Sequence, residues 1–246
     1  MTLEFILLIA VGFFAQLVDG ALGMAFGLIA TTAMLSLGLP PAQASAATHT
    51  AEVFTTGVSG LSHLYFRNIQ PRLFLMLSLS GVVGGVLGAY VLSNIDGKAI
   101  RPFIAAYLLI LGLLILMKAF RLSPTSDDAK TSHAAPLGLV GGFLDAIGGG
   151  GWGPMVTSTL IGSGHAPRTV IGSVNAAEFF VTVAVSTTFF IELGMTHLSH
   201  IAALVIGGAL AAPFGGFIVR RLRPHVLMGV VGFLVAGLAL VQLVRA

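Results

Sequence analysis

The acidic residues that lie inside apolar segments are the first candidates for chemistry. Asp19 and Glu52 recur as Asp145 and Glu178, each pair 126 positions apart, in a chain that has only nine acidic residues. A charged carboxylate at the centre of a bilayer costs about 2.5–3.5 kcal/mol, so each acid must be protonated, paired or hydrogen-bonded to free backbone N–H groups. Carboxyl groups in such places relay protons, hold cations or brace a broken helix.

A run of four glycines, Gly148–Gly151, follows Asp145 and precedes Trp152, Gly153 and Pro154. Each glycine is about 1 kcal/mol worse than Ala in a helix, whereas Pro154 suits a first helical turn, so the chain should break and restart here. A restarted helix presents free N–H groups and the positive end of its dipole, which form an anion site without a basic side chain. The alternative is that these glycines only allow close helix packing. The run is not a phosphate loop, because no Lys-Ser/Thr pair follows it.

Polar side chains follow one face of each segment that comes after the acidic positions. They are Ser45, His49, Glu52, Thr56 and Ser59 in the first half, and Asn175, Glu178, Thr182 and Ser186 in the second. Spacings of three and four place each set on one helical face. His49 and Asn175 occupy equivalent positions and differ, which favours a substrate-facing role. His49 could donate to an anion or titrate near neutral pH.

These patterns predict one interior site. The predicted substrate-binding residues are Gly149, Gly150, Gly151, Trp152, Gly153, Asn175, His49 and Gly23, and the predicted proton-coupling residues are Glu52, Glu178, Asp19 and Asp145. A purely structural role stays open for the acids, because each could cap a broken hairpin of its own half or of the other half. Ordinary packing stays open for Trp152, the only Trp.

The elements that must hold these residues are those of a membrane protein. The 246 residues are 56% hydrophobic and 9% charged with a mean hydropathy of +1.00, whereas soluble domains carry about 25% charged residues. A spanning helix needs about 20 apolar residues. Full or nearly full length is reached by Leu3–Val18, Ala42–Ser62, Leu73–Leu92, Ala99–Ala119, Pro167–Phe190, Ser199–Val219 and Val226–Val244, and the shorter segments are Met24–Leu37, Pro136–Ile147 and Trp152–Ser163. The sequence therefore predicts an all-α polytopic membrane protein.

The chain consists of two similar halves. Without gaps, residues 12–59 match residues 138–185 at eleven positions that include both acidic pairs. We predict a first transmembrane repeat at 1–121, a cytoplasmic linker at 122–134 and a second repeat at 135–246. Arg67 and Arg72 lie in one loop of the first half, whereas the basic cluster at 220–223 lies in the next loop of the second half. By the positive-inside rule this exchange predicts inverted-topology repeats with both termini external, and Lys98 and Arg101 are exceptions on the outside.

The short segments fit this topology as hairpins. The segments at 3–37 and 136–163 must each enter and leave on the same side of the membrane. The two pieces of the second pair have about 12 residues, or about 18 Å, little more than half of the hydrocarbon core. They are predicted to form Gly-broken, re-entrant helical hairpins, and matching interruptions in two halves point to a transporter binding site.

Two runs of the second half resemble a known family. Gly142–Pro154 (GFLDAIGGGGWGP) and Gly172–Phe180 (GSVNAAEFF) look like the sulfite exporter TauE/SafE family of membrane permeases, and the chain length and the degenerate first-half copy fit as well. The resemblance implies transport of sulfite, organosulfonates or related sulfur- or carboxylate-bearing anions, outward and driven by the proton gradient. The first half departs from the pattern, since Ala21–Met24 replaces the glycine run, so the second hairpin should bind more of the anion.

Together, the residues and the resemblance predict a secondary carrier in the inner (plasma) membrane and not an enzyme. Its expected partners are a small anionic substrate, protons and the lipid bilayer, with homo-oligomerisation left open. No nucleic acid, cofactor or metal is expected, because the net charge of +3 comes from a few loop residues and there is no cysteine. Three alternatives stay open: a cation or metal carrier with Asp19, Glu52, Glu178 and His49 as ligands, an intramembrane enzyme built on His49 and Glu52, and a non-transporting scaffold.

Overall fold

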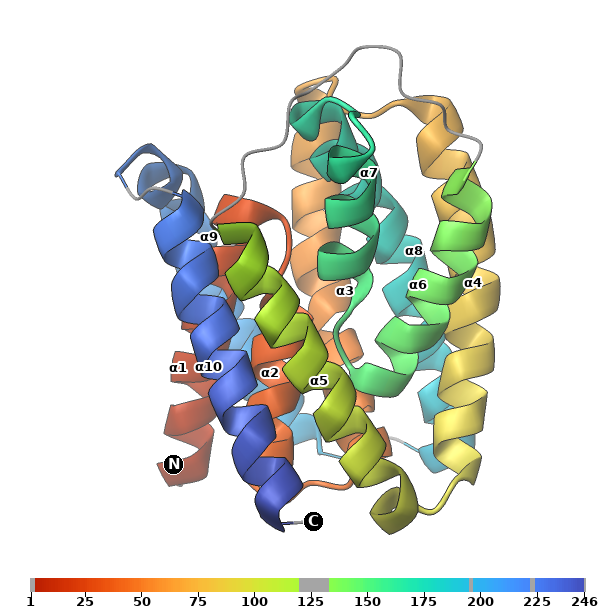
Figure 1. Ribbon diagram of the computed structural model, residues 1–246, viewed down its shortest axis with the longest axis vertical. Helices are drawn as coiled ribbons and strands as arrows, with labels where there is room; N and C mark the ends of the chain where they lie inside the picture. The colour runs from red at the N-terminus through yellow and green to blue at the C-terminus, as the bar shows by residue number, and fades with distance from the viewer. Residues whose placement is uncertain (1–2, 120–132, 195–196, 222–223, 246) are drawn as a thin grey trace.

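The computed structural model describes residues 3–119, 133–194, 197–221 and 224–245, and this part of the chain is helical without a strand (Figure 1). The elements are α1 (Leu3–Leu22), α2 (Phe26–Ser36), α3 (Pro41–Tyr65), α4 (Pro71–Asn94), α5 (Gly97–Ala119), α6 (Ala134–Gly148), a π-helical turn η2 (Gly153–Thr157), α7 (Ser158–Gly162), α8 (Pro167–Leu193), α9 (Leu198–Arg221) and α10 (Pro224–Arg245). The all-α prediction is confirmed, and each apolar segment of the sequence corresponds to one helix or to the η2–α7 pair.

Prolines and glycines delimit the helices that carry the predicted site. Pro41 and Pro167 stand in the first turns of α3 and α8, where a missing N–H leaves no intrahelical hydrogen bond unmade. Gly38 and Gly164 turn the chain just before these helices with φ of 94° and 93°, a left-handed conformation that favours glycine. The same turn therefore occurs twice, at positions 126 residues apart.

Two elements differ from the ranges expected from hydropathy. α1 runs to Leu22 rather than Val18, so Asp19 lies inside the helix near its C-terminal end. The segment after Trp152 begins with the π-helical turn η2, in which Pro154 stands in the first turn, and continues as α7. The predicted linker at 122–134 falls almost wholly outside the described residues, and its last residue opens α6.

Large apolar side chains cover the outside of the bundle. Ile191 and Phe233 are 77% and 76% exposed, as expected of side chains that contact lipid. Within the described residues, Pro71–Asn94, Gly97–Lys118 and Pro167–Leu193 are long and apolar enough to cross a membrane. The α3 helix, which the sequence also predicts to span, is less apolar because of its polar face. Length and composition thus suit a membrane protein.

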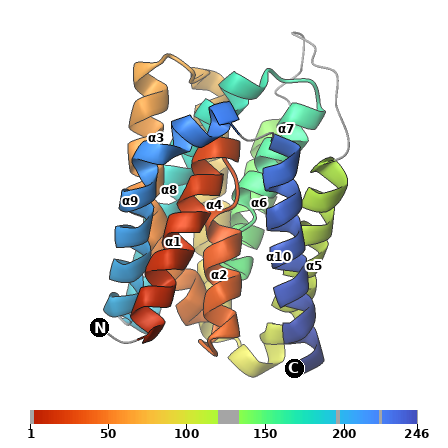
Figure 2. The ribbon, with the colours of Figure 1, turned by 90° about the vertical axis from the view of Figure 1, so that its left-hand side faces the viewer.

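Helices of one half pack against helices of the other. α4 lies against α6 and α9 against α1, while α3 pairs with α8 and α5 with α10 (Figure 1, Figure 2). Glycines permit this approach: a Cβ on Gly84 would overlap the carbonyl of Leu139, and one on Gly207 would overlap the carbonyl of Ile9. α1 starts and α10 ends at the same end of the molecule, whereas α6 starts at the opposite end (Figure 1). The arrangement brings the α1–α2 and α6–η2 connections together in the interior.

Candidate functional site

The α6–η2 connection breaks the helix where the glycines predict a break. α6 is closed by Gly149, which adopts a left-handed φ of 65° and donates its N–H to the carbonyl of Asp145 at 2.7 Å. The α1–α2 connection has the same geometry: Gly23 has a φ of 65°, and its N–H donates to the carbonyl of Asp19 at 2.6 Å. Both halves therefore end their first helix in the same way.

The aspartate side chains cap the helices that restart after the breaks. Asp145 Oδ1 accepts a hydrogen bond from the backbone N–H of Trp152 at 2.9 Å, and Asp19 Oδ1 accepts one from Phe26 at 3.4 Å. These N–H groups lie at the beginning of new helical segments, where no intrahelical acceptor is available. Both aspartates thus brace the breaks, which is the structural role that the sequence left open for them.

His49 ties the second break to α3. The ring is fully buried, with Nε2 3.2 Å from Asp145 Oδ2 and Nδ1 2.8 Å from the carbonyl oxygen of Ser45. A carbonyl oxygen only accepts, so Nδ1 carries a hydrogen. The contact with Asp145 then needs a second hydrogen, either on Nε2 or on the carboxyl group. The pair is accordingly an imidazolium with a carboxylate or a neutral imidazole with a protonated carboxyl.

Three hydroxyl side chains also hold the second break. Thr31 Oγ1 donates to the carbonyl of Gly149 at 2.5 Å and shares a 2.9 Å hydrogen bond with Thr48 Oγ1. Ser45 Oγ donates to the carbonyl of Ala146 at 2.6 Å. All three hydroxyls are buried. Thr31 and Ser45 satisfy the carbonyl groups of Gly149 and Ala146, which the interrupted helix leaves free, and Thr48 bonds Thr31.

These contacts differ in how far sequence patterns predict them. Ser45 lies on the polar face predicted for its helix, and Thr31 is one of the residues identical in the two halves, although neither was assigned to the break. Thr48 has no such signal, because Val174 occupies its equivalent position. Tyr107 of α5 also packs here, since a Cβ on Gly151 would overlap its hydroxyl, yet it stands alone in an apolar segment without any periodic cue.

The two breaks meet around one small cavity. Its volume is about 10 Å³, which is room for about one water molecule. The predicted residues that line it are the four acids Asp19, Glu52, Asp145 and Glu178, together with Gly150, Gly151, Trp152 and Gly153. The predicted residues that do not line it are Gly23, His49, Gly149 and Asn175. No Lys or Arg is among the described residues at its wall.

The two glutamates of the cavity have different surroundings. Glu52 accepts a hydrogen bond from the backbone N–H of Gly27, and its Oε2 has no partner among the described residues. Glu178 has the carboxyl groups of Glu52, Asp19 and Asp145 as its charged neighbours. Glu52 is therefore anchored to the first hairpin, whereas Glu178 has no corresponding bond to the second hairpin among the described residues.

Asn175 lies behind the first break. It is 3% exposed, and its side-chain nitrogen would be 3.6 Å from a Cβ on Gly23. Its Oδ1 has no hydrogen-bond partner in the described part of the chain. Trp152 is fully buried, and its Nε1 donates to the carbonyl of Val174 at 3.3 Å. The indole thus joins the second break to α8.

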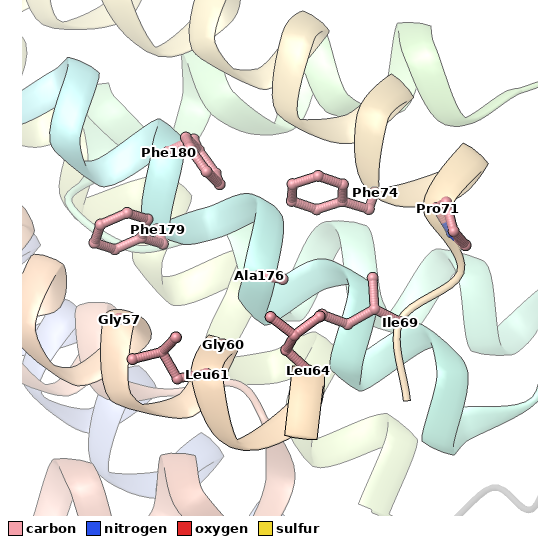
Figure 3. Close-up of a pocket in the computed structure, with 10 residues that line it drawn as sticks. All are labelled: Gly57, Gly60, Leu61, Leu64, Ile69, Pro71, Phe74, Ala176, Phe179 and Phe180. Carbon is pink, nitrogen blue, oxygen red and sulfur yellow. The ribbon is translucent and has the colours of Figure 1, made fainter. Parts of the chain in front are cut away.

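A larger groove lies elsewhere, between α3, α4 and α8 (Figure 3). Its volume is about 600 Å³, and Leu61, Leu64, Phe74, Phe179 and Phe180 are among its lining residues. The described residues that line it include no polar or titratable side chain, and so they offer no side-chain group for ion binding or proton transfer. The small acidic cavity is therefore the better candidate site. Across the residues that the structure describes, no three His, Cys, Asp or Glu side chains are arranged to hold a metal ion.

Comparison with known proteins relates nearly the whole chain to membrane transporters. Residues 8–241 match the family model described as sulfite exporter TauE/SafE. The chain is 39% identical over 235 residues to the "Probable membrane transporter protein YtnM" of Bacillus subtilis (strain 168), which covers 92% of this chain and 78% of that protein. It is 28% identical over 197 residues to the "Probable membrane transporter protein ORF9" of Sinorhizobium sp, covering 76% and 67% of the two chains. No solved structure matches.

Proposed function

Because the chain belongs to the sulfite exporter TauE/SafE family and is a membrane transporter rather than an enzyme, we propose that it exports small sulfur-containing anions, such as sulfite or organosulfonates, by proton-coupled secondary transport across the plasma membrane. The observation that carries the proposal is the meeting of both helix breaks and four carboxyl groups at one cavity. Intramembrane acids at such a place are typical of proton relays.

Coupling follows from the charge of the cavity wall. A carboxylate repels an anion, whereas a protonated glutamic acid does not and can donate a hydrogen bond to it. Glu52 and Glu178 are the groups proposed to take up the proton, since the aspartates are occupied with capping the helices. Binding of proton and anion thus becomes mutually favourable, so the two are carried in the same direction and export is driven by the outward gradient of the anion. The backbone N–H groups of Gly150, Gly151 and Gly153 supply the remaining anion contacts, since that of Trp152 is bonded to Asp145.

We also propose an inverted-topology repeat with re-entrant hairpins, external termini and a cytoplasmic linker. α6 has 15 residues, or about 22 Å, which is less than the hydrocarbon thickness of about 30 Å. The opposite starting ends of α1 and α6 (Figure 1) support the inversion. Equal φ values at Gly23 and Gly149 support two similar hairpins. After the anion is released, the carrier returns without substrate, and the same closed cavity must then open to the other side of the membrane.

A second candidate is a cation or metal carrier. The observation in its favour is the same cavity wall, which has four carboxyl groups and no described basic side chain. The two candidates differ in the sign of the carried charge, so one transport assay separates them.

The test is uptake of radiolabelled sulfite and of a small sulfonate panel into proteoliposomes, with and without an imposed pH gradient. Saturable, gradient-dependent flux is expected. Glu52→Gln and Glu178→Gln should each abolish the response to the gradient. Glu192→Gln is the matched control, because this glutamate is exposed at the end of α8 and away from the cavity. Flux of a divalent metal with none for any anion would establish the second candidate instead.

A further inference from the structure

Lys98 and Arg101 lie in a segment that the predicted topology places outside, so the positive-inside rule does not explain them. In the structure they line a pocket of about 510 Å³ with Leu35, Ser36 and Gln242, among others. The pocket lies where the C-terminal end of α2, the start of α5 and the end of α10 meet, at the end of the molecule that holds both termini (Figure 2). It is separate from the acidic cavity, with which it shares no lining residue.

The basic side chains retain unused donors. Arg101 Nη2 donates to the carbonyl of Leu35 at 2.6 Å, at the end of α2, and this uses one of the five N–H groups of a guanidinium. The ammonium group of Lys98 forms no ion pair with a described acid. The nearest acid in sequence, Asp96, is exposed, accepts a hydrogen bond from the backbone N–H of Lys98 at 3.0 Å and is not part of the pocket wall. The pocket is therefore positively charged.

A fixed polar wall faces these charges. Gln242 is 5% exposed, and its Nε2 donates to the carbonyl of Thr32 and to Ser36 Oγ, each at 3.1 Å. These bonds hold α10 against the last turn of α2. Leu238 and Val241 supply an apolar side of the same pocket. One ligand can thus meet two cationic groups and an apolar surface together.

We propose that this pocket is an external binding subsite for an organic sulfonate, whose oxyanion contacts Lys98 and Arg101 and whose tail lies against Leu238 and Val241. A guanidinium presents its donors in a fork that suits a multi-oxygen anion, and the volume exceeds what an inorganic oxyanion would fill. The choice of a sulfonate rests on the proposed function. The site would hold the anion after release from the interior and before it enters the external medium.

A phospholipid headgroup offers similar anionic chemistry, so the test separates the two sources. The protein is placed in nanodiscs of neutral lipid, and the rate at which an amine reagent modifies Lys98 is measured by mass spectrometry with and without hexanesulfonate. The chain has three lysines, so Lys118 and Lys130 serve as internal references. We expect saturable protection of Lys98 by about tenfold and no protection of Lys118. Equal rates would overturn the proposal, and so would protection by phosphatidylglycerol nanodiscs without sulfonate.

Transport kinetics give an independent readout. Lys98→Gln should raise the apparent KM from the external side about tenfold and leave the internal value unchanged. Arg101→Gln should act likewise, but it also removes the bond to Leu35, so Lys98→Gln carries the conclusion. Arg72→Gln, an exposed arginine in the first turn of α4, is the control. Protection of Lys98 without any sulfonate transport would support the pocket and contradict the export proposal. Sulfonate transport without protection of Lys98 and without a change in the external KM would contradict the pocket and support the export proposal.

Discussion

The two helix breaks share one backbone geometry but are held in different ways. At the second break, Asp145 accepts from Trp152 at 2.9 Å and also contacts His49. At the first break, Asp19 accepts from Phe26 at the longer distance of 3.4 Å. The position equivalent to His49 is occupied by Asn175, whose Oδ1 has no partner among the described residues.

The difference extends to the helices behind the breaks. α3 bonds the second hairpin directly through Ser45, and its Thr48 bonds Thr31 of α2, which in turn bonds Gly149. The residues of α8 equivalent to Ser45 and Thr48 are Ile171 and Val174. A Cβ on Gly23 would lie 2.8 Å from Ile171, so α8 meets the first break with an apolar side chain at this position. Hydrogen bonds have directional geometry and fix a backbone, whereas apolar contacts tolerate sliding. We therefore expect the second hairpin to be the fixed wall of the cavity and the first hairpin to be the part that moves.

Removing each aspartate gives the largest expected contrast. Asp145→Ala leaves the Trp152 N–H and the buried His49 without their partner, and it should lower the free energy of unfolding by about 3–5 kcal/mol. Asp19→Ala should lower it by about 1 kcal/mol, since it removes capping contacts with the backbone N–H groups of Phe26 and Ala25 but leaves no histidine without its partner. Denaturant titration in mixed micelles measures both values. Equal losses would mean that the second break is not the better anchored one.

Adding a methyl group tests whether the two breaks touch. A Cβ on Gly150 would overlap the backbone nitrogen of Leu28, so Gly150→Ala should destabilise the protein by about 1–3 kcal/mol. Gly162→Ala is the control, because nothing lies within 4 Å of its added Cβ, and it should be neutral or slightly stabilising. Thermal unfolding in detergent compares the pair. A neutral Gly150→Ala would show that the two hairpins do not touch at Gly150 and Leu28.

Making the first break resemble the second should slow the carrier. Asn175→His puts an imidazole at the position equivalent to His49, from which we expect it to reach Asp19 as His49 reaches Asp145. We expect a gain of about 1–2 kcal/mol in stability and a roughly tenfold lower export rate, because the mobile hairpin becomes fixed. Proteoliposome flux and thermal unfolding are measured on the same preparation. A stabilised variant with an unchanged rate would refute the assignment of motion to the first hairpin.

The smallest contrast uses a pair of equivalent threonines. Thr31 bonds the carbonyl of Gly149, so Thr31→Val should cost about 1 kcal/mol of stability. Thr157 Oγ1 has no partner among the described residues, so Thr157→Val should change stability by less than about 0.5 kcal/mol or increase it. The difference between the two unfolding midpoints is the measurement. If Thr157→Val lowered the unfolding midpoint more than Thr31→Val, the threonine hydroxyls would not explain the difference between the two breaks.

The helices and the acidic pairs were predictable because their signals are local. Uninterrupted apolar runs and the Gly and Pro residues between them located every element, and a constant offset of 126 paired Asp19 with Asp145. Contacts such as Thr31 with Gly149 were not predictable, since they join residues 118 positions apart through the packing of two halves. The loss of symmetry at His49 and Asn175 was visible in the sequence. That difference predicts a substrate contact, whereas in the structure His49 contacts Asp145 and does not line the cavity.

The single tryptophan has a practical consequence. Trp152 is fully buried, lines the acidic cavity and is bonded to the carbonyl of Val174. All indole fluorescence of the protein therefore originates at the candidate site, and no label or engineered residue is needed to observe it. A closed cavity should give emission at short wavelength, and entry of water or an anion should shift or quench it. The chain thus contains its own optical reporter of occupancy, with a time resolution that flux assays lack.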